Sequence, residues 1–158
     1  MTGKKNNSIC PLIIIPVLVL FIQSCASIGL FSESAYNQAV KLKVKSLALM
    51  SKATDGYSNH SGEIDSLKTE LKFAFEYAKG RPDNEITAKQ WEIMINPDRN
   101  LIGGFLRIWK EDLVLSPVFV SEAEGVIGDA YDTIIGLESG KIKPSDLPVG
   151  QSELNKDE

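Results

Sequence analysis

Cysteine is almost absent from this chain of 158 residues. The only two cysteines are Cys10 and Cys25, and both lie within the first 25 residues. Residues 26–158 therefore cannot form a disulfide among themselves. That part of the chain is long enough for one domain, which must be stabilised by its hydrophobic core without a covalent cross-link.

Histidine and recognisable catalytic motifs are equally scarce. His60 is the only histidine and lies in a polar loop expected at residues 54–62, where nothing fixes a partner beside it for general-base catalysis. The chain has no Gly-x-Ser-x-Gly motif, and it has no Glu-x-x-His motif of the kind that builds a di-metal centre between helices. We interpret Glu122, Asp129 and Asp132 as solvated carboxylates. We therefore expect a protein that is not an enzyme and has no metal or cofactor.

The chain also lacks an excess of basic residues. Residues 25–158 hold 15 of the 17 basic residues and all 21 acidic ones, a net charge of −6, which argues against a nucleic-acid partner. The one basic cluster comprises Lys41, Lys43, Lys45 and Lys52. It is suited either to contact with anionic lipid headgroups or to solvation and pairing with acids on a neighbouring helix, and the second interpretation is favoured.

Only one long apolar run is present, and it lies at the N-terminus. Lys4 and Lys5 precede an apolar segment at residues 9–22, which is shorter than the roughly 20 residues that span a bilayer. A basic start followed by a short apolar segment is typical of a secretory signal. The sequence therefore predicts export, with residues 1–24 as the signal peptide.

The residues after the apolar run make this prediction more specific. Ile22-Gln23-Ser24-Cys25 resembles the lipobox of bacterial lipoproteins, although Gln23 stands where the class usually has a small or aliphatic residue. The resemblance implies cleavage before Cys25 and acylation of its sulfur and its new amine, which gives stable attachment to membrane lipid. Ala26 follows the cysteine in place of aspartate, which implies the outer membrane where the host has one.

Two other interpretations use the same residues. Ser24-Cys25-Ala26 also fits a small-x-small cleavage site, which would release a soluble protein that starts at Ser27. Alternatively, the apolar run stays uncleaved as a short anchor, although it contains Pro11 and Pro16. Lipidation at Cys25 remains the favoured prediction.

Apolar residues at helical spacing predict an all-α domain at residues 34–140, between a tether at 25–33 and a disordered tail at 141–158. We expect a bundle of four main helices and one short helix. The four main helices are expected at residues 34–53, 63–79, 97–110 and 116–139. The short helix is expected to follow a capping box at Thr87 and Gln90 and to run for about two turns, ending at residue 95. Asn96 is the expected N-cap of the fourth helix, and Gly103-Gly104 inside it predicts close approach of another helix.

The same spacing predicts which faces are buried. The second helix shows the clearest stripe, and we expect Phe73 and Tyr77 to widen its apolar face. In the first helix the expected core residues are Tyr36, Val40, Val44 and Leu47. In the later helices they are Trp91, Met94, Ile95, Leu101, Phe105, Ile108, Trp109, Phe119, Ala123, Val126, Ile127, Ala130, Ile134 and Leu137.

Two functions fit these expectations. The first is a non-enzymatic interaction module held on a membrane, which binds another envelope protein. Its candidate recognition surface consists of polar residues in turns near the tryptophans: Arg81, Asn84, Asp98, Arg99 and Asn100. The alternative is a small-molecule or lipid carrier with an apolar cavity lined by Phe75, Phe105 and Trp109. Blocks such as Ala88-Lys89-Gln90-Trp91-Glu92 are similar to small bacterial lipoproteins without assigned function, so the resemblance names no activity.

Overall fold

The structure is a computed structural model that describes residues 31–147, and the predicted signal peptide, the lipobox and Cys25 lie outside these residues. Within 31–147 the chain is all-helical, which confirms the predicted fold class. The α-helices are α1 (Glu33–Met50), α2 (Ser61–Lys79), α3 (Glu85–Ile95), α4 (Ile102–Asp112) and α5 (Pro117–Glu138), with short 3₁₀ helices at Tyr57–His60 and Pro144–Asp146. No helix in this part of the chain is long and apolar enough to span a bilayer.

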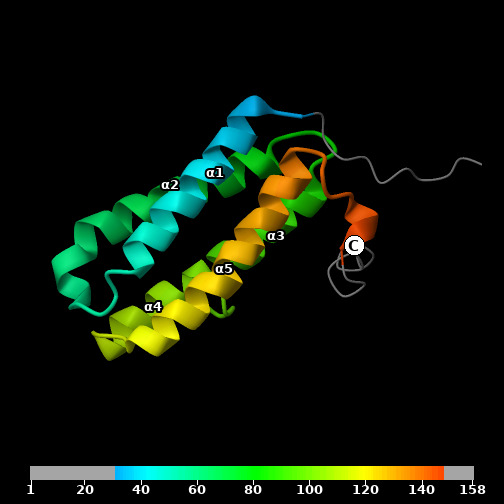
Figure 1. Ribbon diagram of the computed structural model, residues 1–158. Coiled ribbons are helices and arrows are strands. Elements are labelled where there is room, and N and C mark those ends of the chain that lie inside the picture. The colour runs from blue at the N-terminus through cyan, green and yellow to red at the C-terminus, as the bar shows by residue number, and fades with distance from the viewer. Residues whose placement is uncertain (1–30, 148–158) are drawn as a thin grey trace, which may run out of the picture.

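The helices run up and down as an antiparallel bundle. In Figure 1, α3 and α4 follow one another along the bundle, so together they take the place of a single helix that is broken at residues 96–101. We call the end where residue 31 enters the proximal end. There the Ser32 hydroxyl contacts the Tyr77 hydroxyl at 3.2 Å.

The opposite, distal end joins two loops through their backbones. The Tyr57 amide donates to the Leu113 carbonyl at 2.9 Å, and the Leu115 amide donates to the Ala53 carbonyl at 2.8 Å. These bonds tie the connection between α1 and α2 to the connection between α4 and α5, because an amide of each connection donates to a carbonyl group of the other.

Helix α1 starts one residue before the expected position and buries a different face from the expected one. Ser32 caps it by accepting from the Ala35 amide at 3.3 Å. Its buried residues are Ala35, Ala39, Leu42, Ser46, Leu49 and Met50, whereas Val44 is 65% exposed. The predicted stripe through Val40 and Val44 was wrong because the real one passes through small residues. Alanine and serine let neighbouring helices approach closely but carry little hydrophobic signal.

Helix α2 was predicted most accurately. Five of the six residues of its expected stripe are buried, namely Ile64, Leu67, Leu71, Ala74 and Ala78, and the sixth, Phe75, is half-buried against the core. The expectation for Phe73 and Tyr77 was wrong, because Phe73 is 63% exposed and Tyr77 is also exposed. These two rings stack on one another at 6.3 Å on a face that no other described helix covers.

Helix α3 begins at Glu85, two residues before the predicted capping box. Thr87 and Gln90 therefore lie inside the helix and are buried, which makes the capping-box interpretation wrong. Asn84 occupies the N-cap position, but its side chain donates to the Ala78 carbonyl at 3.0 Å and joins α3 to the end of α2. Trp91 and Met94 are buried, as predicted.

Helix α4 begins at Ile102 instead of Pro97. Asn96 accepts a hydrogen bond from the Asp98 amide at 2.8 Å, which is the expected cap bond, but the chain then bends and Leu101 is extended. The reason lies in Gly103 and Gly104. A Cβ at 103 would overlap the Ile95 carbonyl, and a Cβ at 104 would overlap the Arg99 carbonyl. The predicted close approach of another helix is thus made at Gly103 by the end of α3, whereas Gly104 lies against the turn that follows α3.

Helix α5 is capped by Ser116, as predicted, which accepts from the Phe119 amide at 3.2 Å. Its buried stripe includes Ile127, Ile134 and Leu137, as expected. The assignment of Phe119 and Val126 to the core was wrong, since Val126 is 56% exposed and Phe119 is also exposed. This side of α5 faces the space between α4 and α5 and stays partly exposed.

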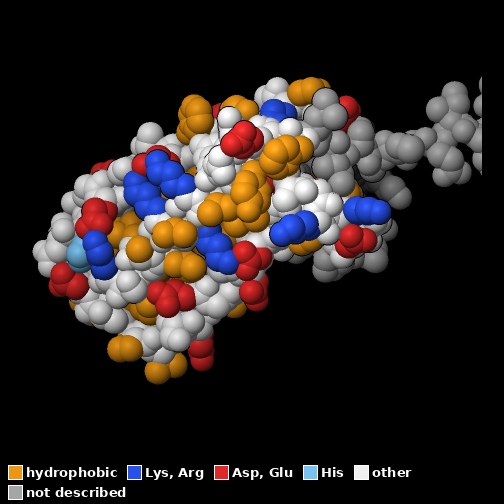
Figure 2. Space-filling model, turned by 45° about the horizontal axis from the view of Figure 1, so that its top comes forward, with side chains coloured by type: hydrophobic (Ala, Val, Ile, Leu, Met, Phe, Trp, Pro, Cys, Tyr) orange, Lys and Arg blue, Asp and Glu red, His pale blue; other side chains and the backbone are white. Residues whose placement is uncertain are grey.

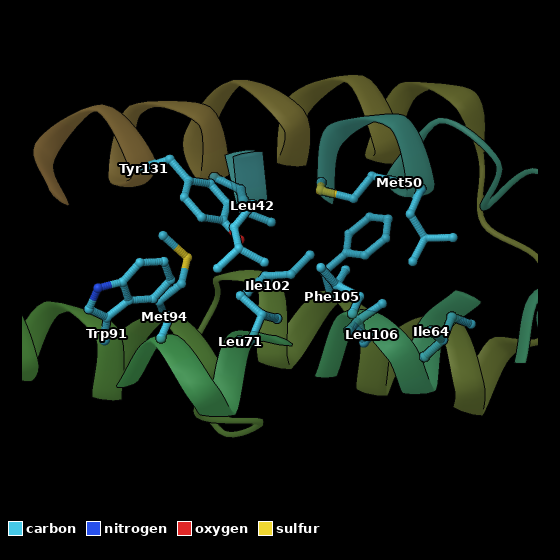
Figure 3. Packing of buried hydrophobic residues seen from close by; sticks show 14 of the residues in the cluster. Leu42, Met50, Ile64, Leu71, Trp91, Met94, Ile102, Phe105, Leu106 and Tyr131 are labelled. Carbon is cyan, nitrogen blue, oxygen red and sulfur yellow. The ribbon is translucent and has the colours of Figure 1, made fainter. Parts of the chain in front are cut away.

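A buried tyrosine joins three helices at the centre of the core. In Figure 3 Tyr131 of α5 lies near Leu42 of α1 and above Trp91 and Met94 of α3. Its ring meets Trp91 edge-on at 6.0 Å, and its hydroxyl is hydrogen-bonded to the Ser46 hydroxyl at 2.7 Å. Burial raises the pKa of Tyr131, so this phenol stays neutral and both buried hydroxyls are satisfied.

The segment after α5 is ordered up to the last described residue. The Ile142 amide donates to the Gly136 carbonyl at 3.0 Å, and a Cβ at 136 would overlap the Ile142 side chain. Leu147 is buried. The tail predicted to be disordered from 141 therefore folds back on the bundle at residues 141–147, and residues 148–158 lie outside the described part.

Candidate interaction surfaces

Two of the predicted recognition residues serve the fold. Arg81 forms an ion pair with Glu138, whose side chain is 1% exposed, and this pair joins the end of α2 to the end of α5. Asn84 is buried and bonded to the Ala78 carbonyl. Neither side chain is available to a partner, so their place in the predicted surface was wrong.

The other three recognition residues lie elsewhere. Asp98, Arg99 and Asn100 are exposed in the turn between α3 and α4. Helix α3, with 11 residues and a length of roughly 16 Å, separates them from Arg81 and Asn84. The predicted residues therefore do not form one surface, although the exposed turn borders both hollows described below.

The tryptophans and the predicted cavity belong to the packed core. Trp109 is fully buried, donates to the Asp55 carbonyl at 3.1 Å, and meets Tyr57 and Phe105 edge-on. The described hollows are lined by neither Phe75 nor Trp109. Among the described residues these hollows do not form the cavity that the sequence suggested between Phe75, Phe105 and Trp109, and the carrier function stays a prediction.

The basic cluster on α1 and in the turn after it is paired with acids, as the favoured interpretation predicted. Lys45 contacts Glu70 at 2.6 Å, Lys43 contacts Asp132 at 2.5 Å, and Lys52 contacts Glu63 at 2.7 Å. Lys41 lies 3.9 Å from Glu70. Figure 2 shows blue Lys and Arg side chains interspersed with red Asp and Glu side chains on this face of the molecule. The Lys45 ammonium group lowers the pKa of Glu70, as expected for an opposite charge at this distance.

His60 is held between two carboxylates at the distal end. One ring nitrogen lies 3.2 Å from Asp55 and the other 3.2 Å from Glu63. Bonds from Lys52 and then His60 lower the pKa of Glu63, and the Gly56 amide is the main cause of the lowered pKa of Asp55. His60 therefore lies on an ordered 3₁₀ helix instead of a loose loop, with both nitrogens occupied. The described residues contain no group of three ligands arranged for a metal ion.

An apolar groove of about 370 Å³ runs between α4 and the first half of α5. We call it the α4–α5 groove. Phe105 and Phe119 stack in it at 6.1 Å. Its lining residues are Asn100, Leu101, Phe105, Ile108, Phe119, Glu122, Ala123, Val126 and Ile127.

Sequence reasoning missed this groove because its residues look like core. Phe119, Val120, Ala123, Val126 and Ile127 fall within one ordinary helical stripe of α5, so the spacing gave no signal that part of this stripe stays exposed. Leu113, Val114 and Val118 add exposed apolar surface at the same end.

A second hollow of about 410 Å³ lies on the other side of the break between α3 and α4, against α2. It differs from the groove in charge, because basic side chains surround it. This hollow and the α4–α5 groove thus differ in charge, although both lie beside the break between α3 and α4. No known protein family matches the chain, and no curated protein and no solved structure matches it.

Proposed function

We propose that this chain is an exported lipoprotein, anchored through acylated Cys25, that presents its helical bundle in the cell envelope as a non-enzymatic interaction module. The lipobox-like residues 22–25 support the anchor, and Ala26 supports the outer membrane in a host that has one. The observation that carries the interaction role is the α4–α5 groove, an apolar surface that no described part of the chain covers.

The position of the groove suits an anchored binding module. The tether would join the bundle at the proximal end, where residue 31 enters, and the groove lies toward the distal end. Phe31 lies six positions after Cys25, which allows a reach of roughly 20 Å. The anchor thus holds the proximal end near the lipid surface, while the groove is left for a partner.

The partner segment is expected to be an amphipathic helix with basic residues on the envelope protein that is bound. Helix α5 contains five acidic residues and no basic one. Glu122, Val126 and Asp129 share one face, which places carboxylates beside the apolar groove. No ion pair occupies Glu122 or Asp129 within residues 31–147, so both are open to basic groups of a partner.

A second copy of this chain is a poor fit for the same groove. A symmetric dimer would place the two α5 helices against one another. Glu122 and Asp129 of one copy would then meet the like charges of the other, which costs affinity. The groove therefore favours a different protein over self-association.

The anchor predicts a clear effect of Cys25→Ala. The variant should lose its acyl chains and move from the membrane fraction to the soluble fraction or remain as an unprocessed precursor. Fractionation and intact-mass spectrometry measure both effects. Cys10→Ala is the matched control, because Cys10 lies in the segment that is removed. Identical mass and fractionation of Cys25→Ala and the unsubstituted chain would refute the anchor.

The groove predicts position-specific cross-linking. A photoreactive amino acid at Val126 should capture an envelope protein through a basic amphipathic segment. The same residue at Val44, an equally exposed valine on α1, should not. Val126→Glu should reduce capture about tenfold or more, because it places a charge in the apolar contact, and Val44→Glu should leave capture unchanged. Equal cross-linking from both positions, or cross-links only to a second copy, would contradict this assignment.

A further inference from the structure

The second hollow combines an apolar floor with a basic rim. It lies between α2, the end of α3 and α4. Leu71, Ile95, Pro97 and Leu106 form the apolar floor. No carboxylate lines it. The four charged residues of its lining are all cations, namely Lys68, Lys72, Arg107 and Lys110. We call it the basic hollow.

Helical spacing explains how the rim and the floor come together. Lys68 and Lys72 lie one turn apart on α2 and flank Leu71, while Arg107 and Lys110 lie three residues apart on α4 next to Leu106. Gly103, also on this face of α4, has no side chain and lies against the carbonyl group of Ile95. The hollow therefore stays open along the break between α3 and α4.

Two of the four cations lack a carboxylate partner. Lys72 is paired with Glu76 at 2.7 Å and Arg107 with Glu111 at 2.8 Å. Lys68 reaches only the Tyr57 hydroxyl, at 3.4 Å, and no acid lies within 4 Å of Lys68 or Lys110 among residues 31–147. The lysines of α1, by contrast, all contact acids. The two unpaired lysines of the basic hollow are also unusual in a chain whose net charge is negative.

We propose that the basic hollow binds an anionic amphiphile with a single acyl chain. The acyl chain would cover the apolar floor, and a carboxylate or phosphate head would lie between Lys68 and Lys110. A volume of about 410 Å³ is within the usual range for small-molecule sites. No aromatic side chain lines the hollow, so it offers no stacking platform for a nucleotide base. This site is independent of the α4–α5 groove, which has the opposite charge.

The test uses a photoreactive dodecanoate and the full chain in its membrane fraction. Mapping of the labelled peptides should place the label on residues 68–72 and 103–110. Unlabelled dodecanoate should compete, whereas acetate, which lacks the tail, and dodecyl maltoside, which lacks the charge, should not. Competition by lysophosphatidylglycerol but not by free dodecanoate would identify a single-chain membrane phospholipid, with a phosphate head in place of the carboxylate, as the source.

Charge reversal separates this site from unspecific adsorption. The double variant Lys68→Glu with Lys110→Glu should lose labelling at least about tenfold, because it replaces both cations that have no acidic partner. Lys79→Glu is the matched control, since Lys79 is an exposed lysine on the same helix outside the hollow. Equal competition by dodecyl maltoside, unchanged labelling of the double variant, or an equal loss in Lys79→Glu would overturn the proposal.

Discussion

Arg81→Ala should lower the free energy of unfolding by about 3–5 kcal/mol, because it leaves the buried carboxylate of Glu138 without its cation. Glu138 is among the most buried polar residues of the described chain, and one of its oxygens already lacks a hydrogen-bond partner there. The ion pair joins the ends of α2 and α5 at the proximal end. Urea denaturation followed by circular dichroism measures the loss.

Two further variants identify the cause. Replacing both partners, Arg81→Met with Glu138→Leu, should recover most of the loss, because no charge then remains buried. Arg99→Ala is the matched control in an exposed turn, and its effect should stay within roughly 0.5 kcal/mol. If Arg81→Ala costs no more than Arg99→Ala, the buried pair does not hold the proximal end together.

Gly104→Ala should be the second strongly destabilising substitution, by about 3 kcal/mol, because the added methyl group has no space. Its Cβ would overlap the Arg99 carbonyl oxygen and lie 3.4 Å from the Pro97 carbonyl oxygen, and neither is a flexible side-chain end. The turn between α3 and α4 would have to move, and both hollows border that turn. Thermal unfolding followed by circular dichroism measures the effect.

Gly125→Ala is the control for the same chemical change. Gly125 lies inside α5, is exposed, and has no atom within 4 Å of an added Cβ. Alanine is the better helix former, so this variant should be more stable by about 0.5–1 kcal/mol. We expect Gly104→Ala to lower the stability of the protein and Gly125→Ala to raise it. If both substitutions raise the stability, the turn before α4 leaves room for a methyl group at position 104.

The sequence was sufficient for the fold class and for α2. Ile64, Leu67 and Leu71 recur at helical spacing, and Gly80 with Pro82 marks the end of the helix, so local signals and tertiary packing agree there. The buried face of α1 was harder to predict because it includes Ala39 and Ser46, which a hydrophobic pattern does not distinguish from exposed residues. Small residues are buried by the close approach of neighbours, which a single sequence does not display.

The surfaces were less predictable than the helices. Phe119 and Val126 lie on an apolar side of α5, and the groove between α4 and α5 leaves that side partly exposed. The start of α4 at Ile102 depends on the contact of Gly103 and Gly104 with the preceding backbone. Arg81 resembled a recognition residue in a polar turn, yet its partner Glu138 is 57 positions away. Each of these outcomes depends on how segments of the folded chain pack against one another, which the periodicity of a single helix does not display.

The backbone bonds at the distal end restrict how this protein can be engineered. The connections at residues 53–57 and 113–115 supply each other's amide partners, so they form one structural unit. An epitope tag or a fluorescent protein inserted into either connection would disturb the other as well. A reporter placed after residue 147 would spare both.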